Sequence, residues 1–195
     1  MERLTTLLTT AASITLPSVL AFTLLRPPLS TQPHLPRHNN SNERKAEPMA
    51  IDRKQLRSYI IRPALSPHGL WSANAEELLM LTAAKESKLG FWIHQLGNGP
   101  ALSPWQVEPA TFDWLRGTFP QYLGGRDSSE LVHDLRLGAL AARVRYLVDP
   151  DPLPHAHDIM GMAMLWKRIF NTVKGKGTVD EAVEAYQKYV VRGEQ

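Results

Sequence analysis

The sequence predicts an all-α fold for the part of the chain that follows Met49. Apolar residues recur there at spacings of three and four, which places them on one face of a helix. Residues typical of helix starts precede these segments, and Pro or Gly follows them. The longest segments of this kind cover residues 75–89, 128–148, 159–170 and 178–190. We therefore expect a domain built from helices joined by short turns.

Length and composition are those of a globular domain with an added tail. The 195 residues allow one domain, or one domain and a tail, and a hydrophobic fraction of 43% is enough for a core. The chain has 22 Lys and Arg against 19 Asp and Glu. This mildly basic balance suits an anionic polymer and does not indicate a nucleic-acid partner. Because there is no cysteine, disulfides and thiolate metal sites are excluded.

Residues 1–48 differ in composition from the rest and are expected to form an N-terminal extension. The segment from Leu4 to Leu25 carries no charge and follows Arg3, as a signal peptide or membrane anchor would. Eight Ser and Thr residues and Pro17 dilute it, and no A-x-A cleavage site follows, which argues against export. The segment from Arg26 to Pro48 is rich in Pro, His and Asn and is expected to be a disordered linker.

A different explanation of this extension is that translation starts at Met49. The codons for residues 42–45 can form a purine-rich stretch just upstream, which would resemble a ribosome-binding site read in frame. We therefore expect the folded domain to span residues 49–195. A natural product that starts at Met1, or at a cleavage point near residue 25, would contradict this hypothesis.

Single residues mark the first two expected helices. Asp52 is expected to cap a short helix that Pro63 closes, because proline disrupts a helix interior. Asn74, with Glu77 three residues later, is expected to cap the helix of residues 75–89 as a variant of the capping box.

The later helices have equally clear starting residues. Pro109 is the expected first residue of a helix that continues through Leu115, and Thr178 and Glu181 form a capping box for the last helix. The faces expected to be buried consist of Leu131, Leu135, Ala139, Ala142 and Tyr146, then Ile159, Met162, Ala163, Trp166 and Phe170, and finally Ala182, Val183, Tyr186 and Val190.

Glu86 is the candidate catalytic residue because it ends a stripe of small and apolar side chains. The other members of the stripe are Ala75, Leu79, Thr82 and Ala83; Glu76, Lys85 and Lys88 lie largely off it. Apolar neighbours and the negative end of the helix dipole both favour the protonated carboxyl group and raise its pKa. A general acid that works near neutral pH requires such a pKa. The alternative is that the Glu86 side chain passes Leu89 into solvent.

The segment after this helix is expected to form a shaped loop. Gly and Pro are frequent between Gly90 and Pro109, which indicates a turn in which the backbone approaches another group closely. Gln95, Trp105 and Gln106 lie within this segment, and a new helix follows it.

The order of these residues resembles a known family. Glu86-Ser87, then Gln106, and then Pro109 and Thr111 in the pattern Q-x-x-P-x-T, is similar to the ES...GLMQ-x-x-P-x-T motif of the SLT group of lytic transglycosylases in the lysozyme-like superfamily. The variant KES...GPALSPWQVEPAT is similar to transglycosylase-like proteins encoded in bacteriophage structural gene clusters. Phe170-Asn171 resembles the Tyr-Asn pair that closes the cleft in this group. The resemblance spans about residues 70–189 and implies a lysozyme-like helical domain.

The chain departs from the family pattern at three places. Ser103-Pro104-Trp105 stands where the group has Gly-Leu-Met, the loop between Glu86 and Gln106 is slightly long, and Phe170 lacks the hydroxyl group of the family's tyrosine. These changes affect the expected cleft and its substrate fit more than the catalytic group itself.

The resemblance implies cleavage of peptidoglycan between N-acetylmuramic acid and N-acetylglucosamine. Glu86 would protonate the glycosidic oxygen and then deprotonate the C6 hydroxyl, which attacks C1 and leaves a 1,6-anhydro end without consuming water. No cofactor is implied. Glycan strands are the expected partner, together with other virion proteins, and the expected location is a virion or the bacterial cell envelope. The residues expected to bind the substrate or line its cleft are Ser87, which would also orient Glu86, Gln95, Trp105, Gln106, Phe170 and Asn171.

Two alternatives to a transglycosylase remain open. A hydrolytic lysozyme would use a second carboxylate, and the nearest ones in sequence are Glu108 and Asp113, both of which are expected to face solvent. A virion protein with the same fold and no activity would be consistent with the altered Gly-Leu-Met triplet.

Two other clusters, which could suggest a metal site and a phosphate site, are expected to have structural roles only. His155, His157 and Asp158 match no standard zinc spacing, so no metal site is expected. Residues 175–178, Gly-Lys-Gly-Thr, lack the P-loop spacing and a preceding strand.

Helix position also predicts the surroundings of two further groups of residues. Met160, Met162 and Met164 are expected to pack in the core. Arg136 and Arg143 are expected on a solvated face, although a polar cleft could recruit Arg143 or Arg145.

Overall fold

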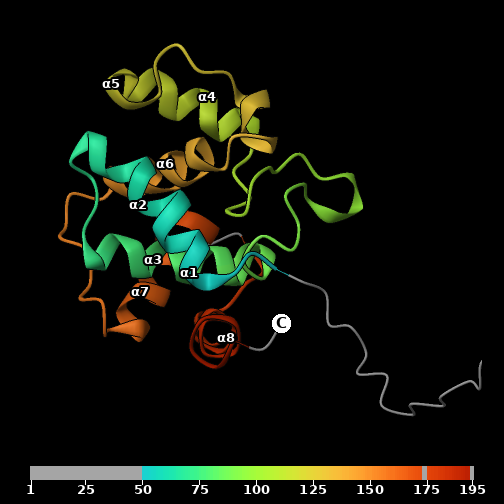
Figure 1. Cartoon of the computed structure of the whole chain (residues 1–195), viewed down its shortest axis with the longest axis vertical. Helices are drawn as coiled ribbons and strands as arrows, with labels where there is room; N and C mark the ends of the chain where they lie inside the picture. The colour runs from blue at the N-terminus through green and yellow to red at the C-terminus, as the bar shows by residue number, and fades with distance from the viewer. Residues whose placement is uncertain (1–49, 173–174, 194–195) are drawn as a thin grey trace, which may run out of the picture. The chain divides into compact units, whose positions relative to one another are not determined.

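Helix α3 (Ala73–Ser87) lies at the centre of the structure, with other helices on both sides of it (Figure 1). The structure is a computed structural model that describes residues 50–172 and 175–193. Within these ranges the chain forms helices and turns, and isolated β-bridges at Leu102 take the place of strands. The predicted all-α class is confirmed.

The other elements surround α3 in two groups. Helices α4 and α5 lie beyond α6 on one side, whereas α7 and α8 cover the other side (Figure 1). In chain order the elements are α1 (Arg53–Gln55), a π-helical segment (Leu56–Ile61), α2 (Arg62–Leu65), a 3₁₀ turn (Ser66–His68), α3, a 3₁₀ turn (Leu96–Asn98), α4 (Pro109–Thr118), α5 (Pro120–Leu123), a 3₁₀ turn (Ser128–Val132), α6 (Leu135–Arg145), a 3₁₀ turn (Tyr146–Val148), α7 (Ile159–Leu165), a π-helical segment (Trp166–Asn171), α8 (Val179–Ala185) and a last π-helical segment (Tyr186–Arg192).

The first helix continues past Pro63, so the prediction that Pro63 closes it is wrong. Asp52 caps the helix as expected, because its Oδ1 accepts hydrogen bonds of 3.0 Å from the backbone N–H groups of Lys54 and Gln55. A π-helical segment then widens the helix just before the proline. Pro63 consequently becomes the second residue of α2, a position at which a missing N–H group costs little.

Helix α3 begins two residues earlier than expected, at Ala73. Its cap is Ser72, whose Oγ accepts from the backbone N–H of Ala75 at 3.1 Å. The expected cap, Asn74, instead accepts from the N–H of Ala156 at 2.9 Å and so connects α3 to the loop before α7. A hydroxyl two residues earlier therefore replaces the predicted amide cap.

The end of α3 is set by three consecutive residues with positive φ. Lys88, Leu89 and Gly90 have φ values of 53°, 60° and 80°, which turn the chain out of the helix after Ser87. A Cβ atom on Gly90 would lie 2.7 Å from Cδ1 of Ile51. Glycine is therefore required at position 90 for two reasons, its conformation and its close contact.

Glu76, which the helical periodicity places off the predicted stripe of α3, is nevertheless buried in an ion-pair cluster. Its carboxylate accepts hydrogen bonds from Arg57, Arg62 and Trp71 at distances between 2.6 and 3.2 Å, although Glu76 itself is only 4% exposed. Arg57 also pairs with Glu77 at 2.7 Å. The three donors compensate the carboxylate for the loss of water, which apolar periodicity alone cannot reveal.

The helix expected over residues 128–148 is broken into two. A capping box of Asp127 and Glu130 starts a 3₁₀ turn, and α6 begins only at Leu135 with Asp134 as its cap. Arg126 pairs with both Glu130 and Asp134, at 2.7 and 2.6 Å. The acidic caps and their shared arginine thus favour a restart in place of one continuous helix.

The C-terminal helices follow the predicted pattern more closely. The capping box of Thr178 and Glu181 opens α8 as predicted. Met162 is fully buried, but Met160 and Met164 are 50% and 59% exposed, so the expected methionine cluster in the core is wrong for these two. Each lies two residues from Met162 along the helix, so both point away from the face that carries Met162.

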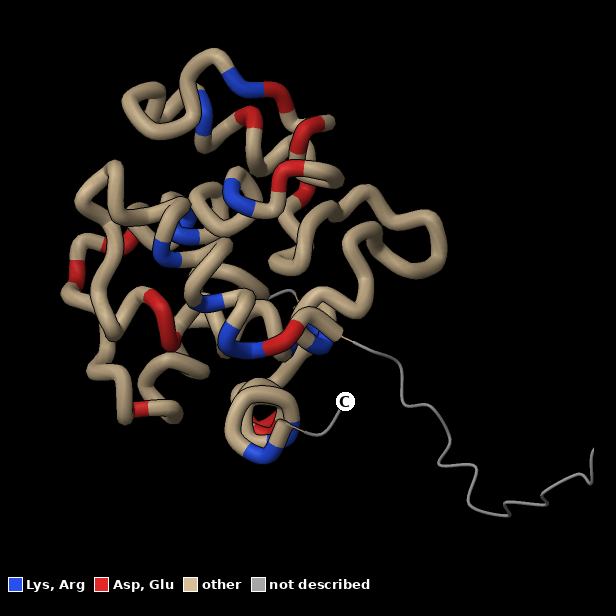
Figure 2. Tube along the Cα trace, viewed as in Figure 1, with Lys and Arg blue, Asp and Glu red and all other residues tan. Residues whose placement is uncertain are grey.

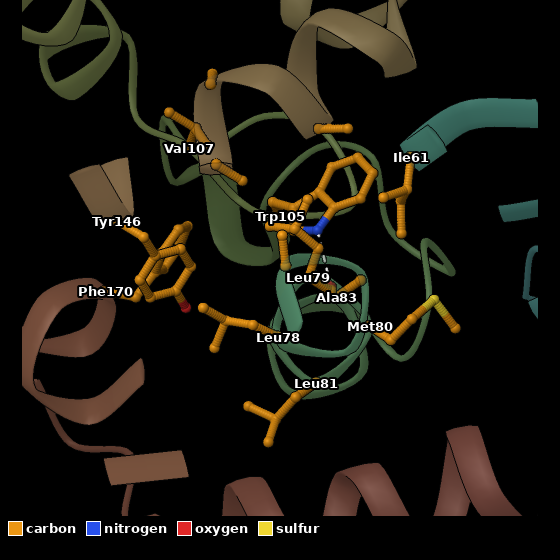
Figure 3. Close-up of a cluster of buried hydrophobic side chains, with 14 of the residues drawn as sticks. Ile61, Leu78, Leu79, Met80, Leu81, Ala83, Trp105, Val107, Tyr146 and Phe170 are labelled. Atoms are coloured by element: carbon orange, nitrogen blue, oxygen red, sulfur yellow. Dashed lines mark hydrogen bonds between the residues drawn. The ribbon is translucent and has the colours of Figure 1, made fainter. Parts of the chain in front are cut away.

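The core is continuous from α3 to the loop that follows it (Figure 3). Trp105 has no exposed surface and lies against α3, where its Nε1 donates to the carbonyl oxygen of Leu79 at 3.0 Å. Tyr146 and Phe170 stack with ring centroids 5.6 Å apart. The five residues that we expected to share a stripe on α3 are buried except Glu86, which is partly buried.

Acidic and basic residues are interspersed along the described helices, but the loop between α3 and α4 carries neither from residue 89 to 107 (Figure 2). No described helix combines the length and the apolar character that a membrane span needs. The predictions for the N-terminal extension, residues 1–48, lie outside the described residues.

Candidate active site

The carboxylate of Glu86 is held by a residue from a distant part of the chain. Its Oε1 accepts a hydrogen bond of 2.8 Å from Nε1 of Trp166, whose side chain has no exposed surface. Within residues 50–172 and 175–193, Oε2 has no hydrogen bond. The alternative in which Glu86 passes Leu89 into solvent does not hold, because Leu89 is fully buried and Glu86 bonds to Trp166.

Burial raises the pKa of Glu86 above its ordinary value, in the predicted direction. The hydrogen bond from Trp166 and the positive charges of Arg145 and Lys85 act in the opposite direction but do not outweigh it. A carboxyl group with a raised pKa holds its proton closer to neutral pH. It is therefore suited to donate that proton to a leaving group.

Trp166 is itself fixed by its surroundings. Nζ of Lys85 lies 5.7 Å from the centroid of its ring and pairs with Glu181 at 2.7 Å. A Cβ atom on Gly177 would lie 2.8 Å from Cη2 of Trp166. The glycine in Gly-Lys-Gly-Thr thus allows the backbone to approach the indole ring, which gives this sequence a packing role.

Glu86 opens onto a pocket of about 370 Å³ between α3, the loop after it and the end of the helix that contains Trp166. Two residues of the predicted motif, Gln106 and Thr111, share this pocket with Glu86. The complete lining consists of Glu86, Gln95, Ala101, Gln106, Glu108, Thr111, Arg145, Phe170, Asn171 and Thr172. The structure thus brings five of the seven predicted site residues together.

A second pocket of about 240 Å³ adjoins the first. Glu86, Gln95 and Gln106 line both pockets, and the second is completed by Trp92 and Leu96. Glu86 therefore lies where two hollows meet: the larger is a polar pocket, and the smaller adds the apolar side chains of Trp92 and Leu96 to the shared polar residues. An elongated ligand could occupy both hollows and place a central bond at the carboxylate.

Gln95 and Gln106 belong to the loop between α3 and α4, and hydrogen bonds within this loop fix both side chains. Gln95 accepts from the N–H of Ala101 at 3.2 Å through its side-chain oxygen. Gln106 has a positive φ of 49°, and its Nε2 donates to the carbonyl oxygen of Ser103 at 2.8 Å. These bonds hold both amide side chains at the pocket wall.

Phe170 and Asn171, the predicted counterpart of a cleft-closing pair, both line the pocket. Phe170 is only 5% exposed, and Oδ1 of Asn171 accepts from Nζ of Lys167 at 2.8 Å. A Cβ atom on Gly175 would lie 2.2 Å from the backbone oxygen of Asn171, so the chain folds back closely over this residue.

Ser87 and Trp105 do not line the pocket, which corrects their expected roles. Ser87 is fully buried, and its Oγ donates to the carbonyl oxygen of Pro104 at 2.6 Å and accepts from the N–H of Gly90 at 2.7 Å. Trp105 is bound to Leu79 within the core. Both residues support the loop from behind and contact no surface that a substrate could reach.

The sequence analysis missed or undervalued three residues around Glu86. Trp166 was expected only as core, because periodicity indicates that it is buried but not that it meets Glu86. Glu108 is exposed and lines the pocket. Arg145 lines it as well, as one of the two arginines for which a polar cleft was considered. Arg143 does not, and its buried Nε and Nη1 have no hydrogen-bond partner within the described part of the chain.

The described residues offer no obvious metal site. Residues 50–172 and 175–193 contain no group of three or more His, Asp or Glu side chains arranged to hold an ion. His155 Nδ1 accepts from the N–H of His157 at 3.3 Å, and Asp158 caps α7 through the N–H of Gly161. These residues therefore have structural roles in the turn before α7.

Comparison with known proteins adds no family assignment. No protein-family model, no curated protein and no solved structure matches the chain. The function is consequently inferred from the geometry around Glu86 and from the motif that contains it.

Proposed function

We propose that this protein is a peptidoglycan lytic transglycosylase with a lysozyme-like helical fold and Glu86 as its general acid and base. The observation that carries the proposal is a partly buried carboxyl group with a raised pKa, bound by Trp166 and facing a pocket that Gln106 shares. The resemblance of the Glu, Gln, Pro and Thr spacing supports the same assignment. It also suggests a phage-encoded protein that acts from a virion or in the cell envelope.

In the proposed mechanism the two carboxylate oxygens of Glu86 have distinct roles. Because Oε1 accepts from Trp166, Oε2 is the oxygen that would carry the proton. In the proposed reaction Oε2 donates this proton to the glycosidic oxygen as the bond to C1 breaks. The ionised carboxylate then takes the proton of the C6 hydroxyl, and the C6 oxygen bonds to C1. Glu86 thus ends the cycle protonated, and no water is consumed.

Polar and aromatic residues of the pocket would hold the sugar. Gln95, Gln106 and Asn171 present amide groups, which can hydrogen-bond to hydroxyl and acetamido substituents. Trp92 is partly exposed and offers a ring surface in the smaller pocket beside Glu86. Such a mixture of a few polar groups and aromatic surface is typical of carbohydrate sites.

A hydrolytic lysozyme is the second candidate, and one observation favours it. Glu108 lines the same pocket as Glu86 and could activate a water molecule as a second carboxylate. Asp113 does not fit this role, because it is exposed on α4, outside the lining residues, and pairs with Arg116 at 3.1 Å.

An inactive structural protein is less well supported than either enzyme. The argument for it rested on the altered triplet Ser103-Pro104-Trp105, which was expected to change the cleft. These three residues are buried and face α3 and α6, as the close approach of Ser103 to Gly138 indicates. The substitution therefore changes how the loop is supported, while the pocket residues remain in place.

Digestion of purified bacterial cell walls tests the proposal. We expect the full chain to release muropeptides with 1,6-anhydro ends, and Glu86→Gln to lower the rate by about 100-fold or more. Glu108→Gln should remain active, and mass spectrometry of the products distinguishes the candidates. Reducing ends together with loss of activity in Glu108→Gln would select the lysozyme. Equal activity of wild type and Glu86→Gln, or none in either, would refute both.

A further inference from the structure

Arg145 is the one arginine among the residues that line the pocket beside Glu86. Its Nη2 donates to the backbone oxygen of Phe170 at 2.6 Å, and its guanidinium carbon lies 4.2 Å from the centroid of the Phe170 ring. Both contacts hold the side chain against one wall. A guanidinium group has five N–H donors, and the described residues provide an acceptor for one of them.

No carboxylate neutralises Arg145 within the described part of the chain. Glu86 and Glu108 are near enough to influence its charge, but neither forms an ion pair with it. By contrast, Arg57, Arg62, Arg116, Arg126 and Arg168 each pair with an acidic side chain. Burial also lowers the pKa of Arg145, and the nearby Tyr146, Glu86 and Glu108 offset only part of this effect. Arg145 is thus a fixed and incompletely paired cation at the pocket wall.

The loop that lines both pockets carries no charge. Residues 89–107 contribute five residues to the two pockets, namely Trp92, Gln95, Leu96, Ala101 and Gln106, and none of them is Lys, Arg, Asp or Glu. The charged lining residues other than Glu86 are Arg145 and Glu108, and both line the larger pocket and not the smaller one. The two hollows that meet at Glu86 are therefore electrostatically different.

We infer that Arg145 binds a carboxylate group of the substrate, and that the polar pocket consequently receives the acidic sugar of the glycan. This inference rests on the proposed function and specifies which end of the scissile disaccharide lies on which side of Glu86. A guanidinium fork matches a carboxylate geometrically, and such bonds are stronger than those between neutral groups. The neutral sugar would then occupy the smaller pocket, beside Trp92 and Leu96.

The carboxylate can come from two sources in peptidoglycan. In a glycan without peptides, each muramic acid carries a free lactyl carboxylate. In a glycan with peptides, that group is an amide and the carboxylates belong to the stem peptide. The chemistry that Arg145 recognises is the same in both cases, so the two sources are separated by using both substrates.

Binding to a non-cleaving variant provides the test. In full-length Glu86→Gln, calorimetry would compare three ligands: a peptide-free tetrasaccharide of alternating N-acetylglucosamine and N-acetylmuramic acid, the same glycan with its stem peptides, and neutral chitotetraose. Adding Arg145→Gln should weaken binding of a carboxylated glycan about 10-fold or more, while the affinity for chitotetraose changes less than about 2-fold. Arg145→Lys should give an intermediate loss, because it keeps the charge and loses the fork.

A matched control uses another arginine of the same helix. Arg136 is exposed on α6, lies outside the polar pocket and donates to the backbone oxygen of Tyr59 at 3.1 Å. Arg136→Gln should leave the affinity for all three ligands unchanged. The glycan that responds to Arg145→Gln identifies the source of the carboxylate.

The possible failures are distinguishable. Equal weakening of charged and neutral glycans would mean that Arg145 only supports Phe170, and no weakening of either charged glycan would also overturn the inference. If Arg145→Gln does not fold, the salt dependence of glycan binding is measured with Arg145 intact. In that case 0.5 M NaCl must weaken binding of the charged glycan and leave the affinity for chitotetraose unchanged. Failure to bind any of the glycans would refute the proposed function itself.

Discussion

The indole Nε1 of Trp166 donates a hydrogen bond of 2.8 Å to Oε1 of Glu86, which joins two residues eighty positions apart in the chain. A hydrogen bond to a carboxylate favours its charged form and so lowers its pKa. Trp166→Phe should therefore raise the pKa of Glu86 further. Since Glu86 must be protonated to act as an acid, the alkaline limb of the pH–rate profile should move to higher pH.

The pH–rate profile of cell-wall cleavage checks this prediction, together with denaturant unfolding. Loss of the bond and of part of the ring should cost about 1–3 kcal/mol of stability. Tyr186→Phe serves as a control for loss of a single distant hydrogen bond, here the one to Glu77 at 2.7 Å. An alkaline limb at the same pH in Trp166→Phe and wild type would show that the bond does not tune Glu86.

Replacement of Glu86 should make stability less dependent on pH. Because its folded-state pKa is raised, the carboxyl group favours folding most below its unfolded-state pKa, and this contribution is lost as pH rises through the folded-state pKa. Glu86→Gln does not titrate. Its Tm should therefore exceed that of wild type at pH 8, and the difference should shrink toward pH 4. Circular dichroism melts at several pH values measure this, and a difference that grew on acidification would contradict it.

Glu76 should have the opposite pH dependence. Its burial tends to raise the pKa, but hydrogen bonds from Arg62, Trp71 and Arg57 outweigh burial and lower it. The stabilisation by Glu76 is thus present above the unfolded-state pKa and is lost as pH falls through the folded-state pKa. Glu76→Gln should destabilise the protein by about 3 kcal/mol at pH 7, because two arginines lose a buried partner.

An exposed ion pair provides the comparison for this cluster. Asp113 pairs with Arg116 on the surface of α4, with side chains 50% and 38% exposed. Asp113→Asn should change the free energy of unfolding by about 0.5 kcal/mol or less. Urea unfolding of both variants at pH 7 and pH 4 tests the contrast. Similar losses in the two variants would refute the special role of Glu76.

Substitution at Gly90 should be more costly than at Gly69. Both have positive φ, 80° and 66°, so alanine is strained at either position by about 1–2 kcal/mol. At Gly69 a new Cβ meets nothing within 4 Å, whereas at Gly90 it lies 2.7 Å from Ile51. The additional cost of Gly90→Ala should disappear in the double variant with Ile51→Ala. Double-mutant-cycle unfolding measurements check this, and an equal cost in both backgrounds would contradict it.

The sequence determines one part of the site well. The spacing of Ala75, Leu79, Thr82 and Ala83 places Glu86 at the end of a buried stripe, because helix periodicity alone decides which side chains share a face. The Glu-to-Gln motif likewise predicted that Gln106 would lie beside Glu86, and they share two pockets. Caps with ideal partners, such as Thr178 with Glu181, were also predictable.

The rest depends on contacts that local patterns do not encode. Trp105 was expected in the cleft because aromatic faces suit sugar rings, but positive φ values at Ser103 and Gln106, 69° and 49°, turn the indole ring into the core. Neither residue type signals that conformation. The partner of Glu86 was equally hidden, since the pattern around Trp166 fixes its burial and not its neighbour. The break before α6 arose from an arginine shared by two caps, which is a tertiary contact.

Two backbone hydrogen bonds close the base of the loop after α3. The N–H of Gln95 donates to the carbonyl oxygen of Ala101 at 2.9 Å, and the N–H of Ser103 donates to that of Ile93 at 2.8 Å. Leu96, in the tip, is 63% exposed and lines the smaller pocket. A fluorophore or a short peptide grafted at the tip would consequently lie beside the smaller pocket and leave Glu86 and Gln106 unchanged. A label at this position would report when a polysaccharide binds and when it dissociates.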